Sequence, residues 1–108
     1  MKKVSVIGLG YVGLGIAVFA SQKNKVIGLE INEKKVEILK NGNSYIEGIE
    51  SKIVKEAIQS GNFHPTSNPE DLESSDIVVI CVPTPLNLMR EPDLTLINAA
   101  CDFISDNL

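Results

Sequence analysis

The stretch Gly8-Leu9-Gly10-Tyr11-Val12-Gly13 decides the fold that this sequence predicts. It follows an apolar run at residues 3–7 and leads into an uncharged, helix-like segment. Gly8 lets the chain turn sharply out of a strand, Gly10 has no side chain to block a phosphate, and Gly13 lets the helix pack closely on the strand. Because the free N–H groups and positive dipole end of that helix face the turn, we expect it to hold a dinucleotide pyrophosphate.

A carboxylate at the end of the next apolar run makes this interpretation more specific. Residues 25–29 form a second short apolar run, and Glu30 follows at about the 20-residue distance typical of dinucleotide sites. There the carboxylate can accept hydrogen bonds from the adenosine ribose hydroxyls. Neither Ile31 nor Asn32 is basic, so a 2′-phosphate would meet uncompensated negative charge, and the pattern favours NAD over NADP.

The alternative explanation is that Glu30 and Lys35 are solvent-exposed charges without a ligand. Glu30 can be a strand-end carboxylate without a ligand, and Lys35 can be an ordinary exposed lysine one turn into the next helix. The ligand hypothesis places Lys35 against the adenine or the ribose. A glycine turn with a purely structural role would not explain Glu30.

An N-terminal secretory signal is a further alternative. Lys2 and Lys3 precede an uncharged, mostly apolar stretch at residues 4–20. Four glycines fall within residues 8–15, however, and each costs a helix about 1 kcal/mol relative to alanine. The stretch is also shorter than the roughly 20 residues that span a bilayer. We therefore expect neither a secretory signal nor a membrane segment.

Length and composition indicate one globular domain. The chain has 108 residues, 44% of them hydrophobic, which suffices for a single core. Its net charge is −4 and its lysines are scattered, so nucleic-acid binding is disfavoured. Cys81 and Cys101 lack metal-ligand spacing. We expect reduced thiols, a cytoplasmic location and no metal site.

Apolar runs alternate with helical patterns along the chain. Strands are predicted at residues 3–7, 25–29, 63–64 and 77–82, and helices at 11–22, 32–42, 49–60, 69–72 and 92–108. Asn32 and Asn68 are predicted helix caps. The run at 77–82 is continuously apolar, as expected of a parallel strand covered on both faces.

This alternation predicts a Rossmann-like parallel sheet with helices on both faces. In the strand order 3-2-1-4, the fourth strand becomes an open apolar edge. We expect residues 1–108 to be an N-terminal dinucleotide-binding domain that is truncated after its fourth strand and the next helix. Either the chain is a fragment of a longer enzyme, or another chain covers this edge.

The fourth strand ends at Val82-Pro83-Thr84-Pro85, a second candidate contact with the cofactor. Ligands of open α/β sheets lie beyond the carboxyl ends of the strands. Pro83 and Thr84 are therefore placed to approach the cofactor, Thr84 with a hydroxyl or a backbone group. A rigid proline turn without a ligand is the alternative. His64 has no acid or nucleophile beside it in the sequence, so we expect a structural or surface role.

Three motifs together resemble a known family: the glycine turn through Leu14, the segment at residues 43–47, and Cys81-Val82-Pro83-Thr84-Pro85-Leu86 followed by residues 90–94. They are similar to the N-terminal domain of the UDP-glucose/GDP-mannose dehydrogenases, and most similar to the branch that oxidises UDP-N-acetylated hexosamines. The resemblance implies an NAD-dependent oxidation of the sugar C6 hydroxyl to a carboxylate by two hydride transfers. It also implies a UDP-sugar substrate, a role in polysaccharide biosynthesis and a homo-oligomeric enzyme. Its cofactor positions are Tyr11, Val12, Glu30, Lys35 and Thr84.

The sequence departs from the family pattern at several positions. Glu30 and Asn32 stand where aspartates are common, and Gly15 stands where many members have proline. The family's catalytic cysteine lies downstream of residue 108. Cys81 lies within a predicted apolar strand with no base nearby, so it is not a candidate nucleophile. We expect no catalytic residue in this chain and no activity from it alone.

Two other functions stay open on the sequence. One is a standalone NAD-binding module or regulatory subunit without chemistry of its own. The other is a dehydrogenase acting on hydroxy acids or acyl-CoA. The Val-Pro-Thr-Pro segment argues against the second, though only by resemblance.

Overall fold

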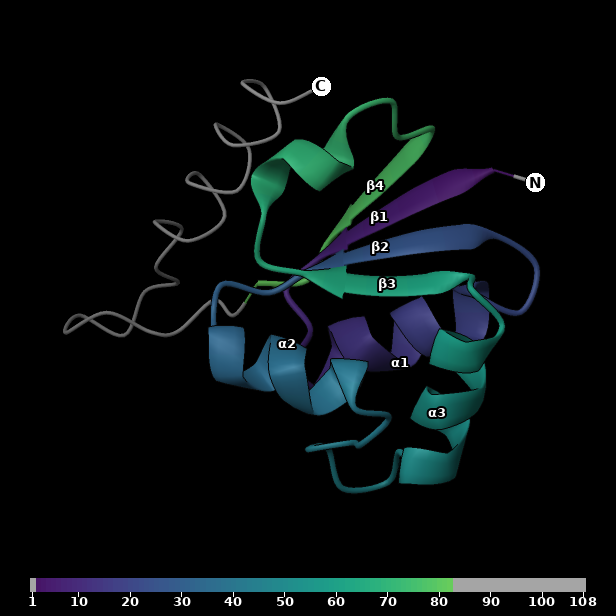
Figure 1. The fold of residues 1–108 in the computed structure, drawn as a ribbon. Helices are drawn as coiled ribbons and strands as arrows, with labels where there is room; N and C mark the ends of the chain where they lie inside the picture. The colour runs from purple at the N-terminus through teal and green to yellow at the C-terminus, as the bar shows by residue number, and fades with distance from the viewer. Residues whose placement is uncertain (1, 83–108) are drawn as a thin grey trace, which may run out of the picture.

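The computed structural model describes residues 2–82, which form a parallel sheet with helices packed against it (Figure 1). The strands are β1 (Lys3–Ile7), β2 (Lys25–Leu29), β3 (Phe63–Thr66) and β4 (Ile77–Ile80). Within this part of the chain their order is β3-β2-β1-β4, and every pair is parallel. The structure thus confirms the predicted sheet and its crossover from the third strand to the fourth.

The helices α1 (Tyr11–Ala20), α2 (Glu33–Lys40) and α3 (Ser51–Gln59) lie together on one face of the sheet (Figure 1). The short 3-10 helix η1 (Pro69–Leu72) covers part of the other face. The sheet therefore separates two hydrophobic clusters, a larger one beneath α1–α3 and a smaller one around Leu72. The predicted final helix at residues 92–108, with Cys101, lies outside the described residues.

Local signals explain most helix boundaries. The Asn32 side chain accepts hydrogen bonds from the N–H groups of Lys34 and Lys35 at the start of α2, and Asn68 caps η1 in the same way. Both caps confirm the prediction, because a side-chain oxygen satisfies amides that have no partner within the helix. Gly42 and Gly61 follow α2 and α3 with positive φ angles of 82° and 80°, which glycine adopts without strain.

The structure differs from the prediction at several boundaries. The second helix spans Glu33–Lys40 instead of residues 32–42, and the third spans Ser51–Gln59 instead of residues 49–60. The first helix ends at Ala20 instead of residue 22, β3 continues to Thr66, and β4 ends at Ile80 instead of residue 82. The expectation that the fourth strand is covered on both faces was wrong for its ends: Ile77 is 46% exposed and Ile80 36%. In the described sheet β4 is one of the two edge strands, with β1 as its neighbour, so it has less cover than the central strands.

The register brings the strand ends to one edge of the sheet. Ile7, the last residue of β1, lies opposite Leu29 of β2 and Ile80 of β4. Leu29 in turn lies opposite Thr66 of β3. The segments after these strands therefore start side by side, at the edge where ligands of open α/β sheets bind.

Candidate dinucleotide-binding site

A cavity of about 640 Å³ lies at the carboxyl ends of β1, β2 and β4, beside the start of α1. This volume is in the range of pockets that bind small molecules and cofactors. Its apolar walls come from the last residues of the three strands and from Ile31 and Val82. Six of the predicted site residues line it: Gly8, Gly10, Tyr11, Val12, Glu30 and Lys35.

The three glycines of the turn differ in whether the fold leaves room for a side chain at their position. Gly8 has a φ angle of +92°, and a Cβ atom there would lie 2.7 Å from the Cys81 carbonyl oxygen. At Gly13 a Cβ would lie 1.8 Å from the Gly8 carbonyl oxygen, so α1 and the turn approach too closely for any side chain. At Gly10 a Cβ would meet no atom within 4 Å. Gly8 and Gly13 are thus required by the fold, whereas Gly10 leaves open space beside the cavity.

Glu30 joins the turn to the start of α2. Its Oε1 accepts a hydrogen bond from the Leu9 N–H at 3.3 Å, and its Oε2 accepts one from the Asn32 N–H at 2.9 Å. Each carboxylate oxygen keeps a further lone pair for another donor. The Glu30 side chain, which is longer than that of an aspartate, therefore folds back onto the turn. Its carboxylate lies at the wall of the cavity.

Tyr45 is a residue of this region to which the sequence patterns assigned no role. It lies between α2 and α3, and its hydroxyl donates a hydrogen bond to the Leu9 carbonyl oxygen at 2.5 Å. The Lys35 ammonium lies 5.4 Å from the centroid of its ring. Burial, and secondarily the Glu30 carboxylate, raises the pKa of Tyr45 well above its usual value, so the hydroxyl keeps its proton. Its only sequence signal was the motif at residues 43–47.

The rim of the cavity carries exposed apolar side chains. Tyr11 is 75% exposed, Val12 61% and Ile31 85%. All three line the cavity, at the first turn of α1 and directly after Glu30. Large apolar groups that face water beside a cavity are typical of surfaces that contact a ligand or a partner.

Cys81 lies at the back of the cavity, after β4. Its N–H donates to the Ile7 carbonyl at 2.7 Å. Burial raises the pKa of its thiol, which disfavours the thiolate that nucleophilic attack requires. Of the three other predicted site residues, Gly13 is not among the residues that line the cavity, and Pro83 and Thr84 lie outside the described part of the chain.

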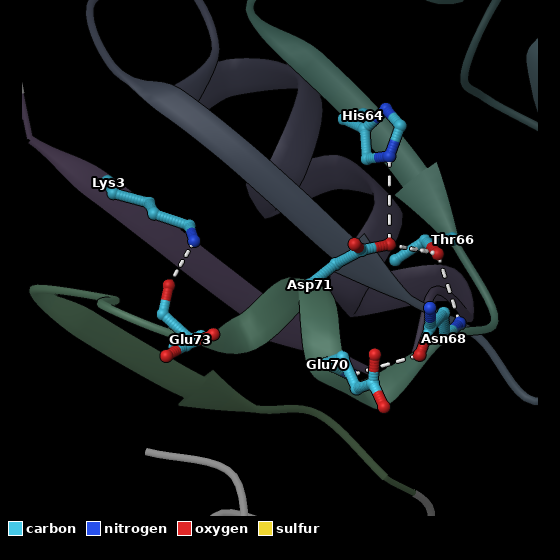
Figure 2. A network of polar contacts seen from close by, with 7 residues as sticks. All are labelled: Lys3, His64, Thr66, Asn68, Glu70, Asp71 and Glu73. Atoms are coloured by element: carbon cyan, nitrogen blue, oxygen red, sulfur yellow. Dashed lines mark hydrogen bonds and ion pairs between the residues drawn. The ribbon is translucent and has the colours of Figure 1, made fainter.

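A separate polar cluster surrounds η1, on the face of the sheet that is opposite to α1–α3 (Figure 2). His64 Nε2 lies 3.8 Å from Asp71 Oδ2, and the Thr66 hydroxyl donates to the same oxygen at 2.6 Å. Lys3 Nζ donates to the Glu73 carbonyl. His64 is thus an exposed strand residue that faces a carboxylate of η1, as expected of a structural or surface role.

The described residues form neither a candidate metal centre nor a helix that could span a membrane. Within residues 2–82, no group of three or more histidine, cysteine, aspartate or glutamate side chains is arranged to hold a metal ion. Nor does any helix in this range have the length and apolar character needed to cross a membrane.

Known proteins match nearly the whole chain, including residues beyond those that the structure describes. Residues 2–108 match the NAD binding domain of the UDP-glucose/GDP-mannose dehydrogenase family. Protein CapL of Staphylococcus aureus is 40% identical over 86% of this chain and 21% of its own length. The UDP-N-acetyl-D-mannosamine dehydrogenase of Yersinia pestis is 39% identical over 96% of this chain and 24% of its own.

A solved structure agrees in three dimensions. The UDP-D-ManNAc dehydrogenase of Pyrococcus horikoshii superposes with a TM-score of 0.91 and 32% sequence identity. The match covers 98% of this chain and 26% of that one. This chain thus spans about a quarter of the length of the relatives it matches.

Proposed function

The chain belongs to the UDP-glucose/GDP-mannose dehydrogenase family, and we propose that it is the NAD-binding part of a nucleotide-sugar 6-dehydrogenase. The whole enzyme would oxidise the C6 hydroxyl of a UDP-sugar to a carboxylate, with NAD accepting a hydride in each of two steps. Residues 1–108 form the N-terminal domain in this proposal. The sugar site and the catalytic cysteine belong to the rest of the enzyme.

The observation that carries the proposal is the open side of the glycine turn. Gly8 and Gly13 are held by contacts within the fold, while Gly10 borders the cavity with nothing to obstruct an approaching group. The first amides of α1 have no carbonyl partner within the helix and carry its positive dipole end. A pyrophosphate bound there needs no basic side chain.

The remaining contacts are inferred from the positions of the side chains around the cavity. Glu30 would accept hydrogen bonds from the adenosine ribose, and Lys35 would lie against the ribose or the adenine. The apolar side chains of Tyr11 and Val12 would cover the cofactor from the start of α1. Pro83 and Thr84 would approach it from the segment after β4.

NAD is proposed over NADP because of the charges around Glu30. A 2′-phosphate on the adenosine ribose would approach the Glu30 carboxylate, and the next two residues, Ile31 and Asn32, carry no positive charge. Lys35 also lines the cavity, with its ammonium over the Tyr45 ring. In this proposal the Glu30 carboxylate is the group beside the ribose hydroxyls, and it would repel a 2′-phosphate there.

Three features of the full-length enzyme are part of the same proposal. Its substrate would be a UDP-sugar, as the names of the related dehydrogenases suggest. It would act in the cytoplasm as a homo-oligomer in polysaccharide biosynthesis. Nucleic acid is not among the proposed partners, because the chain is acidic and its lysines are dispersed.

Calorimetric titration of the chain with NAD and with NADP tests the cofactor site. We expect NAD to bind and NADP to bind at least tenfold more weakly, which corresponds to about 1.4 kcal/mol. Glu30→Ala should weaken NAD binding by about tenfold, because the ribose loses its acceptor. Glu56→Ala, which removes an exposed carboxylate on α3, is the matched control and should leave the affinity unchanged. A preference for NADP, or equal losses in the two variants, would contradict the proposed role of Glu30.

A further inference from the structure

We propose that Tyr45 is a positioning residue of the cofactor site, which holds the phosphate-binding turn in its binding shape and supports Lys35 at the ribose end. The inference rests on the proposed NAD site and adds to it a residue from a loop distant in the sequence. Two contacts carry it, the hydrogen bond from the Tyr45 hydroxyl to the Leu9 carbonyl and the stacking of the Lys35 ammonium on the Tyr45 ring.

The side chain, the N–H and the carbonyl of Leu9 each have a packing or hydrogen-bond partner. Its side chain is completely buried in the larger core cluster, and its N–H donates to Glu30 Oε1. Its carbonyl oxygen accepts the hydrogen bond from Tyr45. On either side, the Gly8 N–H donates to the Leu29 carbonyl at 2.8 Å, and the Gly10 carbonyl accepts from the Leu14 N–H at 3.0 Å. Tyr45 is thus the side chain that controls the carbonyl in the middle of the turn.

Control of that carbonyl also controls the next amide. The Leu9 carbonyl and the Gly10 N–H belong to one planar peptide unit, and in a trans peptide the two groups point in opposite directions. A hydrogen bond that holds the carbonyl toward Tyr45 therefore fixes the direction of the Gly10 N–H. Gly10, whose φ angle is one of the two torsions that turn this unit, would otherwise make it easier to rotate. Gly10 is also the residue of the turn that borders the open side of the cavity.

The ring of Tyr45 connects the turn to the ribose end of the cavity. Lys35 is on α2, lines the cavity and places its ammonium within the distance at which a cation is attracted to an aromatic face. This contact favours a position of the lysine side chain beside the Tyr45 ring, in the cavity that Glu30 also lines. Because the Tyr45 hydroxyl stays protonated, it remains a hydrogen-bond donor throughout the physiological pH range.

A purely structural role predicts something different. Tyr45 packs against the larger core cluster, and its ring alone would serve that purpose. In that case removal of the hydroxyl would change stability but would leave the turn and the cofactor affinity unaltered. The variant Tyr45→Phe separates the two roles, because it keeps the ring and the Lys35 contact and removes only the bond to Leu9.

The matched control is Ser60→Ala at the end of α3. Ser60 also donates a hydroxyl hydrogen bond to a main-chain carbonyl, that of Ala57 at 2.7 Å, away from the cavity, and its oxygen accepts a further bond from the Asn62 N–H at 3.2 Å. Calorimetric titration with NAD should show about tenfold weaker binding for Y45F and a change of less than about twofold for S60A. Thermal unfolding of both variants tests whether their stabilities are comparable.

Amide hydrogen exchange measured by NMR supplies a readout that does not need the ligand. In Y45F the Leu9 amide, which donates to Glu30 Oε1, should exchange faster than in the wild type, because the turn is held less firmly, while the amides of β1 should not change. Unaltered Leu9 exchange, or NAD affinity within about twofold of the wild type, would overturn the role of Tyr45. A wild-type chain that does not bind NAD would overturn the proposed function instead, and Leu9 exchange would still decide whether Tyr45 holds the turn.

Discussion

The cavity at the ends of the strands and the polar cluster around η1 differ in how their groups are held. Both border a hollow, of about 640 Å³ and 440 Å³. The first has apolar walls, and its Glu30 and Tyr45 side chains bond to the main chain of the glycine turn at Leu9. The second is lined mainly by charged side chains, and its His64–Asp71 contact is exposed, with the His64 side chain at 55% and that of Asp71 at 36%.

The comparison teaches that charge density alone does not indicate a binding site. The η1 cluster contains more charged side chains, but solvent screens exposed pairs and their hydrogen bonds serve the attachment of η1 to β3. The cavity offers shape, main-chain donors and a single carboxylate in a partly dry environment. Three substitutions test this contrast between the two regions.

The largest effect is expected from Gly13→Ala. The new Cβ would lie 1.8 Å from the Gly8 carbonyl oxygen, and main-chain atoms cannot give way as a flexible side chain can. We expect a loss of about 3 kcal/mol or more in the free energy of unfolding, together with loss of NAD binding. Urea unfolding monitored by circular dichroism measures it. A variant as stable as the wild type would mean that α1 does not press against the turn.

Gly10→Ala should separate binding from stability. Gly10 has an ordinary φ angle of −80°, and its added Cβ would meet no protein atom, so the free energy of unfolding should change by less than about 1 kcal/mol. The same methyl group would occupy the open side of the turn, and NAD binding should weaken by about 30-fold or more. Titration and unfolding on one preparation compare the two quantities. Undiminished NAD binding would place the pyrophosphate elsewhere.

Asp71→Ala should have the smallest effect. It removes the exposed contact with His64 and the acceptor of the Thr66 hydroxyl. We expect a stability loss of about 1 kcal/mol, because η1 is held less firmly on β3, and NAD affinity within about twofold of the wild type. Thermal unfolding and calorimetry measure the two effects. A large loss of NAD affinity would show that the η1 face takes part in cofactor binding, against the contrast between the two regions.

Local sequence signals predicted much of the fold. The caps Asn32 and Asn68 were identifiable because a cap and the amides it satisfies lie within a few residues. The turn of glycines and the carboxylate after the second strand were identifiable for the same reason. Strand ends were less accurate: β4 is shorter than its apolar run, because pairing with β1 and not apolarity alone decides where a strand ends.

The candidate site was predicted in part. The cavity brings together Gly8, Gly10, Tyr11, Val12, Glu30 and Lys35, each of which was chosen from the sequence. Tyr45 was not assigned a role, because its partner Leu9 is 36 residues away and both are joined only after α1 and α2 pack on the sheet. A tyrosine in a loop carries no periodicity, cap or spacing that would reveal such a contact.

By itself, the sequence determined the order of strands and helices, the glycine turn and the carboxylate after the second strand. These features depend on backbone conformation and on spacing between near neighbours. The tertiary structure alone decided that Gly8 lies against Cys81, that Glu30 folds back to Leu9, and that Tyr45 completes the turn. Such contacts join segments that meet only when the sheet has formed, so their geometry depends on packing and not on local pattern.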